Sequence, residues 1–121
     1  MRQLRGVARS RLALRQWSGD IDSAVEVFAR LAYNAVVHAQ PVNGATAQMH
    51  VHLTFTEKGG LLIDVEDPSP GFPGAQAALR GEKGRGLRDA RRLGADLTWF
   101  LAADGRSKTI RATLPSGEGL T

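Results

Sequence analysis

The sequence contains no cysteine, which excludes disulfide bonds and thiolate metal sites. It has no apolar run long enough to span a membrane. Its basic N-terminus is not followed by the apolar segment that a secretory signal requires. We therefore expect a cytoplasmic protein that does not insert into a membrane.

Aromatic residues are also scarce, at 6% of the chain, and lysine occurs only as Lys58, Lys83 and Lys108. The net charge of +4 and the pI of about 10.3 therefore come mainly from arginines, which are scattered along the chain. Proteins that bind single-stranded nucleic acid use aromatic side chains to stack the bases. The composition consequently does not favour a nucleic-acid partner.

The length and composition are those of one globular domain. The chain has 121 residues, of which 42% are hydrophobic and 23% charged. These values are close to the averages for soluble domains of this size. We expect a single domain over residues 1–121, with a frayed tail at 115–121.

Two helices are expected in the first third of the chain. Residues 7–17 contain neither glycine nor proline and predict a short helix, and Asp20 supplies a cap for the next one. Residues 21–39 carry apolar side chains at helical spacing. A polar row with i, i+4 spacing lies beside this apolar stripe and consists of Arg30, Asn34 and His38.

Two strands joined by a tight turn follow. Residues 51–55 alternate apolar and polar side chains, 57–60 form the turn, and 61–67 form the second strand. Alternation places Asp67 on the same side as three apolar residues, so this acid faces the core. Burying it is costly without a partner, and a ligand is our expected partner. In the alternative interpretation, Asp67 caps the following turn through its own backbone.

The second half of the chain contains a weakly patterned loop at 72–83 and then a helix that Gly94 closes. The helix opens with Gly84-Arg85-Gly86-Leu87, in which two glycines expose backbone N–H groups to an anion such as phosphate. A lone Gly-x-Gly is a weak signal. Two further strands are expected at 97–101 and 110–114.

Together these segments resemble the ATPase superfamily of histidine kinases, DNA gyrase, mismatch-repair ATPases and heat-shock chaperones, which share the Bergerat fold. Within it, the chain looks most like the stand-alone anti-sigma-factor serine kinases. The resemblance covers residues 7–114. Its motifs are Leu31-Ala32-Tyr33-Asn34-Ala35-Val36-Val37-His38-Ala39, Val65-Glu66-Asp67-Pro68-Ser69-Pro70-Gly71 and Gly84-Arg85-Gly86-Leu87 through Gly94.

The resemblance implies a two-layer α/β sandwich with helices on one face of a mixed, mostly antiparallel sheet of four or five strands. It implies that ATP binds with Mg²⁺, that Asn34 holds the metal, and that Asp67 reads adenine. A lid would span about 72–85. The implied nucleotide-contacting residues are Asn34, His38, Asp67, Ser69, Gly71, Gly84, Arg85, Gly86, Leu87 and Thr109.

The sequence departs from the family pattern at three places. Arg30 stands where these kinases carry the glutamate that acts as general base, and arginine cannot take a proton. Ser107-Lys108-Thr109 replaces the Gly-Thr that opens the last strand, which leaves open whether Lys108 or Thr109 backs Asp67. The edge strand that usually precedes the first helix has no counterpart, and a homodimer is left open.

The resemblance therefore implies an ATP-binding regulatory protein whose partner is a sigma factor or an anti-anti-sigma factor. Its nucleotide would be ATP or ADP. Phosphotransfer is doubtful in this interpretation, because Arg30 replaces the glutamate expected as general base. One alternative is the catalytic ATP-binding domain of a two-component histidine kinase. A second alternative is a degenerate module that binds a protein and no nucleotide.

Overall fold

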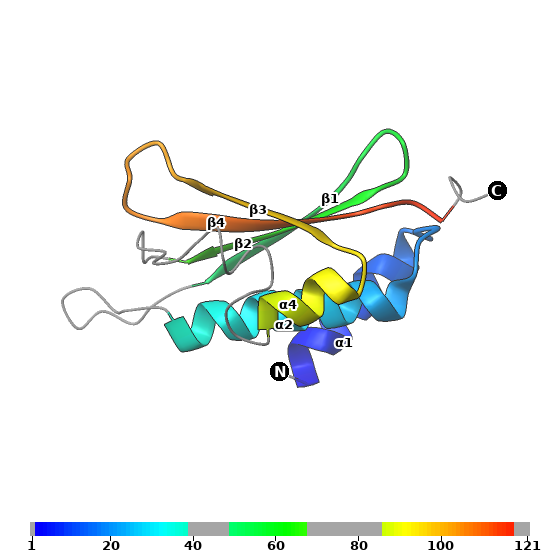
Figure 1. Cartoon of the computed structure of the whole chain (residues 1–121). Helices are drawn as coiled ribbons and strands as arrows, with labels where there is room; N and C mark the ends of the chain where they lie inside the picture. The colour runs from blue at the N-terminus through cyan, green and yellow to red at the C-terminus, as the bar shows by residue number, and fades with distance from the viewer. Residues whose placement is uncertain (1, 39–48, 68–85, 118–121) are drawn as a thin grey trace.

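The computed structural model describes residues 2–38, 49–67 and 86–117. In this part of the chain, three helices lie on one face of a four-stranded sheet (Figure 1). The helices are α1 (Arg2–Leu14), α2 (Ile21–His38) and α4 (Gly86–Arg92). The strands are β1 (His50–Phe55), β2 (Leu61–Asp67), β3 (Asp96–Leu101) and β4 (Lys108–Leu114).

The sheet has the strand order β1-β2-β4-β3, and every described pair of neighbours is antiparallel. The two-layer α/β sandwich is confirmed, and the described part of the chain supplies four strands to its sheet, where four or five were expected. Short hairpins join β1 to β2 and β3 to β4, whereas β2 and β4 are neighbours despite being distant in sequence. The two central strands therefore bring the two halves of the chain together.

The first helix begins earlier and ends earlier than the sequence predicts. It ends at Leu14 because Gln16 adopts a left-handed backbone conformation, with φ of 53°. The Gln16 N–H then donates to the Ala13 carbonyl and the Trp17 N–H to the Leu12 carbonyl, which is the Schellman arrangement of a helix C-terminus. Glycine is usual at this left-handed position, and glutamine gave no such signal.

The predicted cap of α2 is confirmed. The Asp20 carboxylate accepts a hydrogen bond from the backbone N–H of Ser23 and another from its hydroxyl. These bonds favour the ionised form, and the backbone bond contributes most to lowering the pKa of Asp20 below its ordinary value. The predicted end of α4 is confirmed too, since Gly94 adopts φ of 101° and closes that helix.

The core lies between α2 and the two central strands. Along β2, the inward side chains Leu61, Ile63 and Val65 are buried, and they meet Leu114, Ala112 and Ile110 of β4. Helix α2 contributes most of the buried apolar side chains of the helix layer, because it lies between α1 and α4 and packs against the central strands β2 and β4. The helix residues at the centre of this core are Ala24, Val25, Val27, Phe28, Leu31 and Ala35.

The opposite face of the sheet is polar and carries no described helix (Figure 1). There the Arg111 guanidinium donates to both oxygens of Asp64, at 2.8 and 2.9 Å, and lies 5.1 Å from the centre of the Phe100 ring. The hydrogen bond to Asp64 raises the pKa of Arg111 above its ordinary value. This pair joins the two central strands on the face away from the core.

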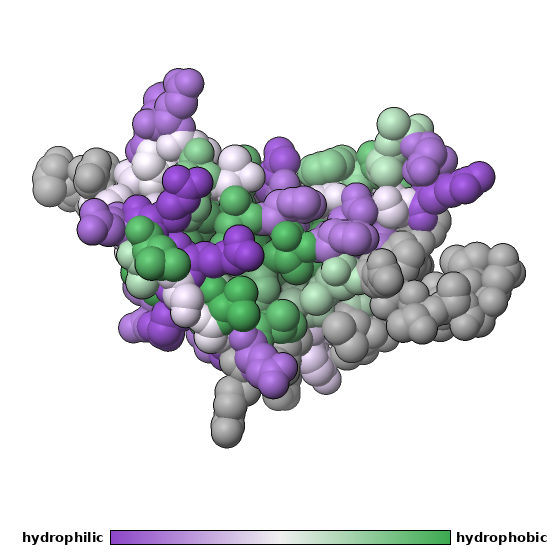
Figure 2. Space-filling model, turned by 180° about the vertical axis from the view of Figure 1, so that it is seen from behind, coloured by the Kyte–Doolittle hydropathy of each residue, from purple (hydrophilic) through white to green (hydrophobic). Residues whose placement is uncertain are grey.

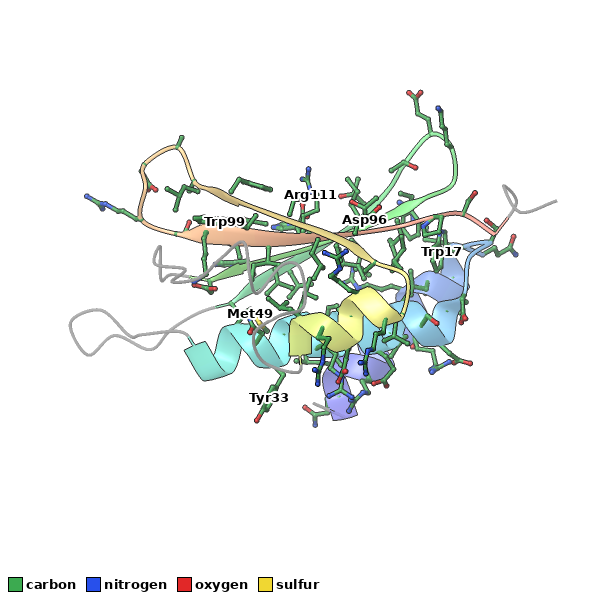
Figure 3. All side chains as sticks on the ribbon, viewed as in Figure 1. Trp17, Tyr33, Met49, Asp96, Trp99 and Arg111 are labelled. Carbon is green, nitrogen blue, oxygen red and sulfur yellow. The ribbon has the colours of Figure 1, made fainter. Side chains whose placement is uncertain are left out.

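Trp17 links the connection between α1 and α2 to the β1–β2 hairpin through a hydrogen bond. Its indole N–H donates to the Gly59 carbonyl at 2.8 Å, and its ring is buried. Figure 3 shows Trp17 at the end of the molecule where these two connections meet.

We expect Trp17→Phe to lower the free energy of unfolding by about 1–3 kcal/mol, because the Gly59 carbonyl loses its donor in a partly buried place. Urea unfolding followed by circular dichroism measures this change. Tyr33→Phe, at an exposed aromatic position of α2, is the control and should change stability little. An equal loss in both variants would show that the indole hydrogen bond contributes nothing.

Candidate functional site

One side of α2 carries the first two polar side chains of the predicted row, and one of them contacts α4. The Arg30 guanidinium lies 3.9 Å from the Asp89 carboxylate, measured from Nη1 to Oδ2. Asn34 follows Arg30 by one helical turn, so it lies on the same side of the helix, and it is half-buried. The helix continues to His38, whose side chain lies outside the described residues. Of this predicted row, Arg30 therefore meets α4, and Asn34 lies one turn further along the same side of α2.

Asp67 lies at the end of β2 with its side chain in the core, as its position in the alternation predicts. Lys108 stands directly opposite on β4, and its ammonium lies 3.1 Å from the Asp67 carboxylate. Both side chains are almost fully buried, with 4% and 2% of their surfaces exposed for Lys108 and Asp67. The chain thus supplies a cation for this acid, whereas a ligand was the expected partner.

The open question of which residue backs Asp67 is thereby answered. Successive residues of a strand point to opposite faces, so Lys108 and Thr109 cannot both face Asp67. The register places Lys108 opposite Asp67 and Thr109 opposite Glu66. Any role of Thr109 at the nucleotide remains a prediction.

The buried ion pair constrains this end of the sheet. Transferring two charges out of water is expensive, and their attraction compensates only when both remain in place. Removing one partner leaves a buried charge without compensation, which costs far more than the net worth of the pair. Asp67 and Lys108 are therefore expected to keep the ends of β2 and β4 in fixed positions.

The helix that the glycine motif opens begins at Gly86. Leu87 is buried in the core, so its side chain holds α4 against the sheet. Gly84 and Arg85 lie outside the described residues, as do Ser69, Gly71 and the lid expected at about 72–85. The predicted phosphate-binding turn and adenine-side turn therefore remain predictions.

Two arginines on the helices each have a buried Nε atom that makes no hydrogen bond to any described residue. They are Arg30 on α2 and Arg88 on α4. Buried N–H groups are nearly always paired in proteins, so these two donors are suited to bind an anion or a water.

Among the described residues, a magnesium ion could be bound only together with the phosphates of a nucleotide. These residues contain no group of three or more histidine, cysteine, aspartate or glutamate side chains that could hold a metal alone. Mg²⁺ keeps several waters and is commonly shared between one or two protein oxygens and the phosphates of a nucleotide. The Asn34 amide oxygen is suited to such a shared ion and not to a site made of protein alone.

Two of these contacts, that of Lys108 with Asp67 and that of Asp89 with Arg30, were not predicted from the sequence. The sequence did indicate that Lys108 faces the core, because this residue alternates with Ile110, Ala112 and Leu114, which are buried residues of β4. Nothing in the sequence indicated the contact of Asp89, because its approach to Arg30 depends on how α4 packs against α2. A pairing between two helices distant in sequence is a tertiary property.

Comparison with known proteins gives the same architecture. No family model and no curated protein matches the sequence. Among solved structures, the histidine kinase domain of the Erythrobacter litoralis EL346 blue-light activated histidine kinase matches with a TM-score of 0.64 and 20% identity. The chain has the histidine kinase-like ATPase fold. That alignment covers 81% of this chain and 48% of the other.

Two further solved structures support the fold. A second structure of the EL346 kinase matches at a TM-score of 0.63 and 20% identity, over 83% of this chain and 32% of that one. The mycobacterial sensor histidine kinase MprB matches at 0.60 and 18% identity, over 96% of this chain and 95% of that one. This chain thus spans about half or less of the EL346 structures and nearly all of the MprB structure. None of the described helices is both long and apolar enough to cross a membrane.

We expect Lys108→Met to lower the free energy of unfolding by about 3–5 kcal/mol, because Asp67 would remain buried without its cation. The double variant Lys108→Met/Asp67→Asn should recover a large part of this loss. Urea unfolding of the wild type, the two single variants and the double variant measures the coupling. Lys58→Met, in the exposed β1–β2 turn, is the control. Additive effects of the two substitutions would contradict an energetic coupling between Asp67 and Lys108.

Proposed function

We propose that the protein binds ATP with Mg²⁺ and acts as a regulator through a protein partner. The observation that supports this function most is the arrangement of Asn34 and Asp67 in a histidine kinase-like ATPase fold. One lies on the side of α2 that borders α4, and the other at the buried end of β2. Both positions match the motifs from which the resemblance was derived.

In this proposal each residue has a defined task. Asn34 offers its amide oxygen to Mg²⁺, and Asp67 accepts a hydrogen bond from the exocyclic amine of adenine. The backbone from Gly84 to Leu87, with Arg85, holds the phosphates, and Ser69 and Gly71 shape the turn beside the base. The remaining contacts are assigned to His38 and Thr109.

Lys108 adds a condition to adenine binding. A carboxylate has several acceptor positions, so Asp67 can keep its bond to the Lys108 ammonium while accepting another from a base. The ammonium also repels a donor that approaches too closely. Adenine must therefore meet Asp67 from the side that Lys108 does not occupy.

Arg30 decides between a binding function and a catalytic one. Phosphoryl transfer depends mainly on positioning and charge stabilisation, but it requires that the attacking hydroxyl lose its proton. Arg30 cannot accept that proton, although its guanidinium can hold a phosphate. This favours a nucleotide-dependent regulator, for which a sigma factor or an anti-anti-sigma factor is the proposed partner.

A second candidate function is that of a catalytic ATP-binding domain in a two-component histidine kinase. The observation in its favour is that the similar solved structures are histidine kinases, one of which is covered almost completely. In that case a histidine on a separate helical segment would receive the phosphoryl group. Incorporation of phosphate into such a segment, and not into a serine or threonine, would distinguish the two functions.

We expect saturable binding when Mg²⁺ and ATP are titrated into the wild type in a calorimeter. Asp67→Asn should weaken this binding at least about tenfold, because a charge-assisted hydrogen bond is lost. Asp64→Asn is the matched control, since Asp64 lies on the same strand but on the open face of the sheet. It should bind as the wild type does.

Two results would contradict this assignment. Absence of saturable binding in the folded wild type would favour the degenerate protein-binding module. Equal affinity of folded Asp67→Asn and wild type would remove Asp67 from the adenine site while leaving nucleotide binding intact. Circular dichroism spectra and melting curves of each variant show whether the protein compared is folded.

We expect Arg30→Glu to raise the rate of ATP hydrolysis at least about tenfold, because it places a proton acceptor where related kinases carry one. The neighbouring Asp89 would repel the new carboxylate, so the substitution is best combined with Asp89→Asn. Asp89→Asn alone is the control. An unchanged rate in the folded double variant would show that the absence of a base at position 30 does not limit hydrolysis.

A further inference from the structure

The strand β1 forms an open edge of the sheet. It pairs with β2 on one side, and no described strand lies on its other side. Edge strands are commonly protected by charged residues or proline, but the six residues His-Val-His-Leu-Thr-Phe contain neither proline nor an acidic or lysine side chain. Within the described residues, this edge is therefore neither paired nor protected against the addition of another strand.

The backbone groups available at this edge follow from the hairpin geometry. The Thr56 N–H donates to the Gly60 carbonyl across the hairpin. Hydrogen-bonding direction alternates along an antiparallel strand, so the backbone N–H and C=O groups of Val51, Leu53 and Phe55 point away from β2. The side chains of these three residues are only half-buried. An added strand would pair these backbone groups and cover the apolar side chains.

Helix α1 lies on the same side of the molecule and has two different faces. Arg5 and Arg9 point to α2, where they form ion pairs with Glu26 and Asp22. The face away from α2 carries exposed apolar and basic side chains (Figure 2 shows apolar residues gathered on this side of the molecule). Its members at helical spacing are Val7, Arg11 and Leu14, of which Leu14 is 83% exposed.

The charge of this face identifies the kind of partner. Arg15, just after α1, lies with its guanidinium 5.2 Å from the centre of the Phe55 ring, which joins the basic face to the edge strand. Within the described chain, Arg11 and Arg15 form no ion pair with a carboxylate, and α1 itself contains no acidic residue. A second copy joined edge to edge would bring two such basic helices together, which like charges disfavour. An acidic segment matches this surface.

We propose that the free edge of β1 and the outer face of α1 form a docking site for an extended, acidic segment of a partner protein. The segment adds to the sheet as a fifth strand. Its backbone pairs with Val51, Leu53 and Phe55, its apolar side chains cover the half-buried ones, and its carboxylates approach Arg11 and Arg15. This site is separate from the proposed nucleotide site and does not depend on nucleotide binding.

The proposal is tested with short capped peptides and the full chain. A peptide that alternates valine and glutamate should bind at least about tenfold more tightly than one that alternates valine and lysine, as fluorescence anisotropy measures. Hydrogen exchange at the backbone N–H groups of Val51, Leu53 and Phe55 should slow when the acidic peptide binds. The N–H groups of His52 and Thr54, which point to β2, provide an internal comparison.

A second experiment tests whether the positive charges of Arg11 and Arg15 select the acidic peptide. Arg11→Glu/Arg15→Glu changes exposed side chains and should reverse the preference between the two peptides, while Arg9→Glu, on the face toward α2, serves as the matched control. Failure of the acidic peptide to bind, or binding without protection of the edge N–H groups, would overturn the proposal. So would self-association that protects the same groups, or duplex DNA binding that Arg11→Glu/Arg15→Glu abolishes.

Discussion

The structure depends on the strict alternation of side chains along the two central strands. Along β2 every second residue is buried, and the same holds for its neighbour β4 over most of its length. A shift of one residue in the pairing of these strands would place Leu61, Ile63 and Val65 in water. It would also separate Asp67 from Lys108 and Asp64 from Arg111. The apolar pattern and the two ion pairs therefore select the same register.

The parts of the fold that the sequence predicted are those that depend on local patterns of residues. Periodicity predicted the apolar stripe of α2 and the inward position of Asp67, and the turn residues at 57–60 predicted the hairpin. Each of these predictions depends on residues close in sequence. Periodicity did not predict the early end of α1, because Gln16 carries no intrinsic preference for a left-handed conformation. Local chemistry was sufficient where it agreed with the tertiary structure.

The candidate site was less predictable for the same reason. Asp67 was identified as a buried acid from its own strand, but its partner comes from a strand that lies far along the chain. Similarly, Arg30 was identified as an unusual residue, whereas its approach to Asp89 required the packing of α2 against α4. The sequence thus indicated which side chains were unusual, and the fold determined which atoms they meet. The roles of Ser69, Gly71, Gly84 and Arg85 remain predictions from the resemblance.

The face of the sheet on which no described helix packs affects how the protein can change over time. Along β2 and β4 a residue that faces the helices must fit a closed apolar space, whereas its neighbour faces water or the pair of Asp64 and Arg111. Tolerance of substitution should therefore alternate from one residue to the next. The polar face can acquire new side chains without disturbing the layer that holds Asp67. A new binding surface could evolve there while the proposed nucleotide site is conserved.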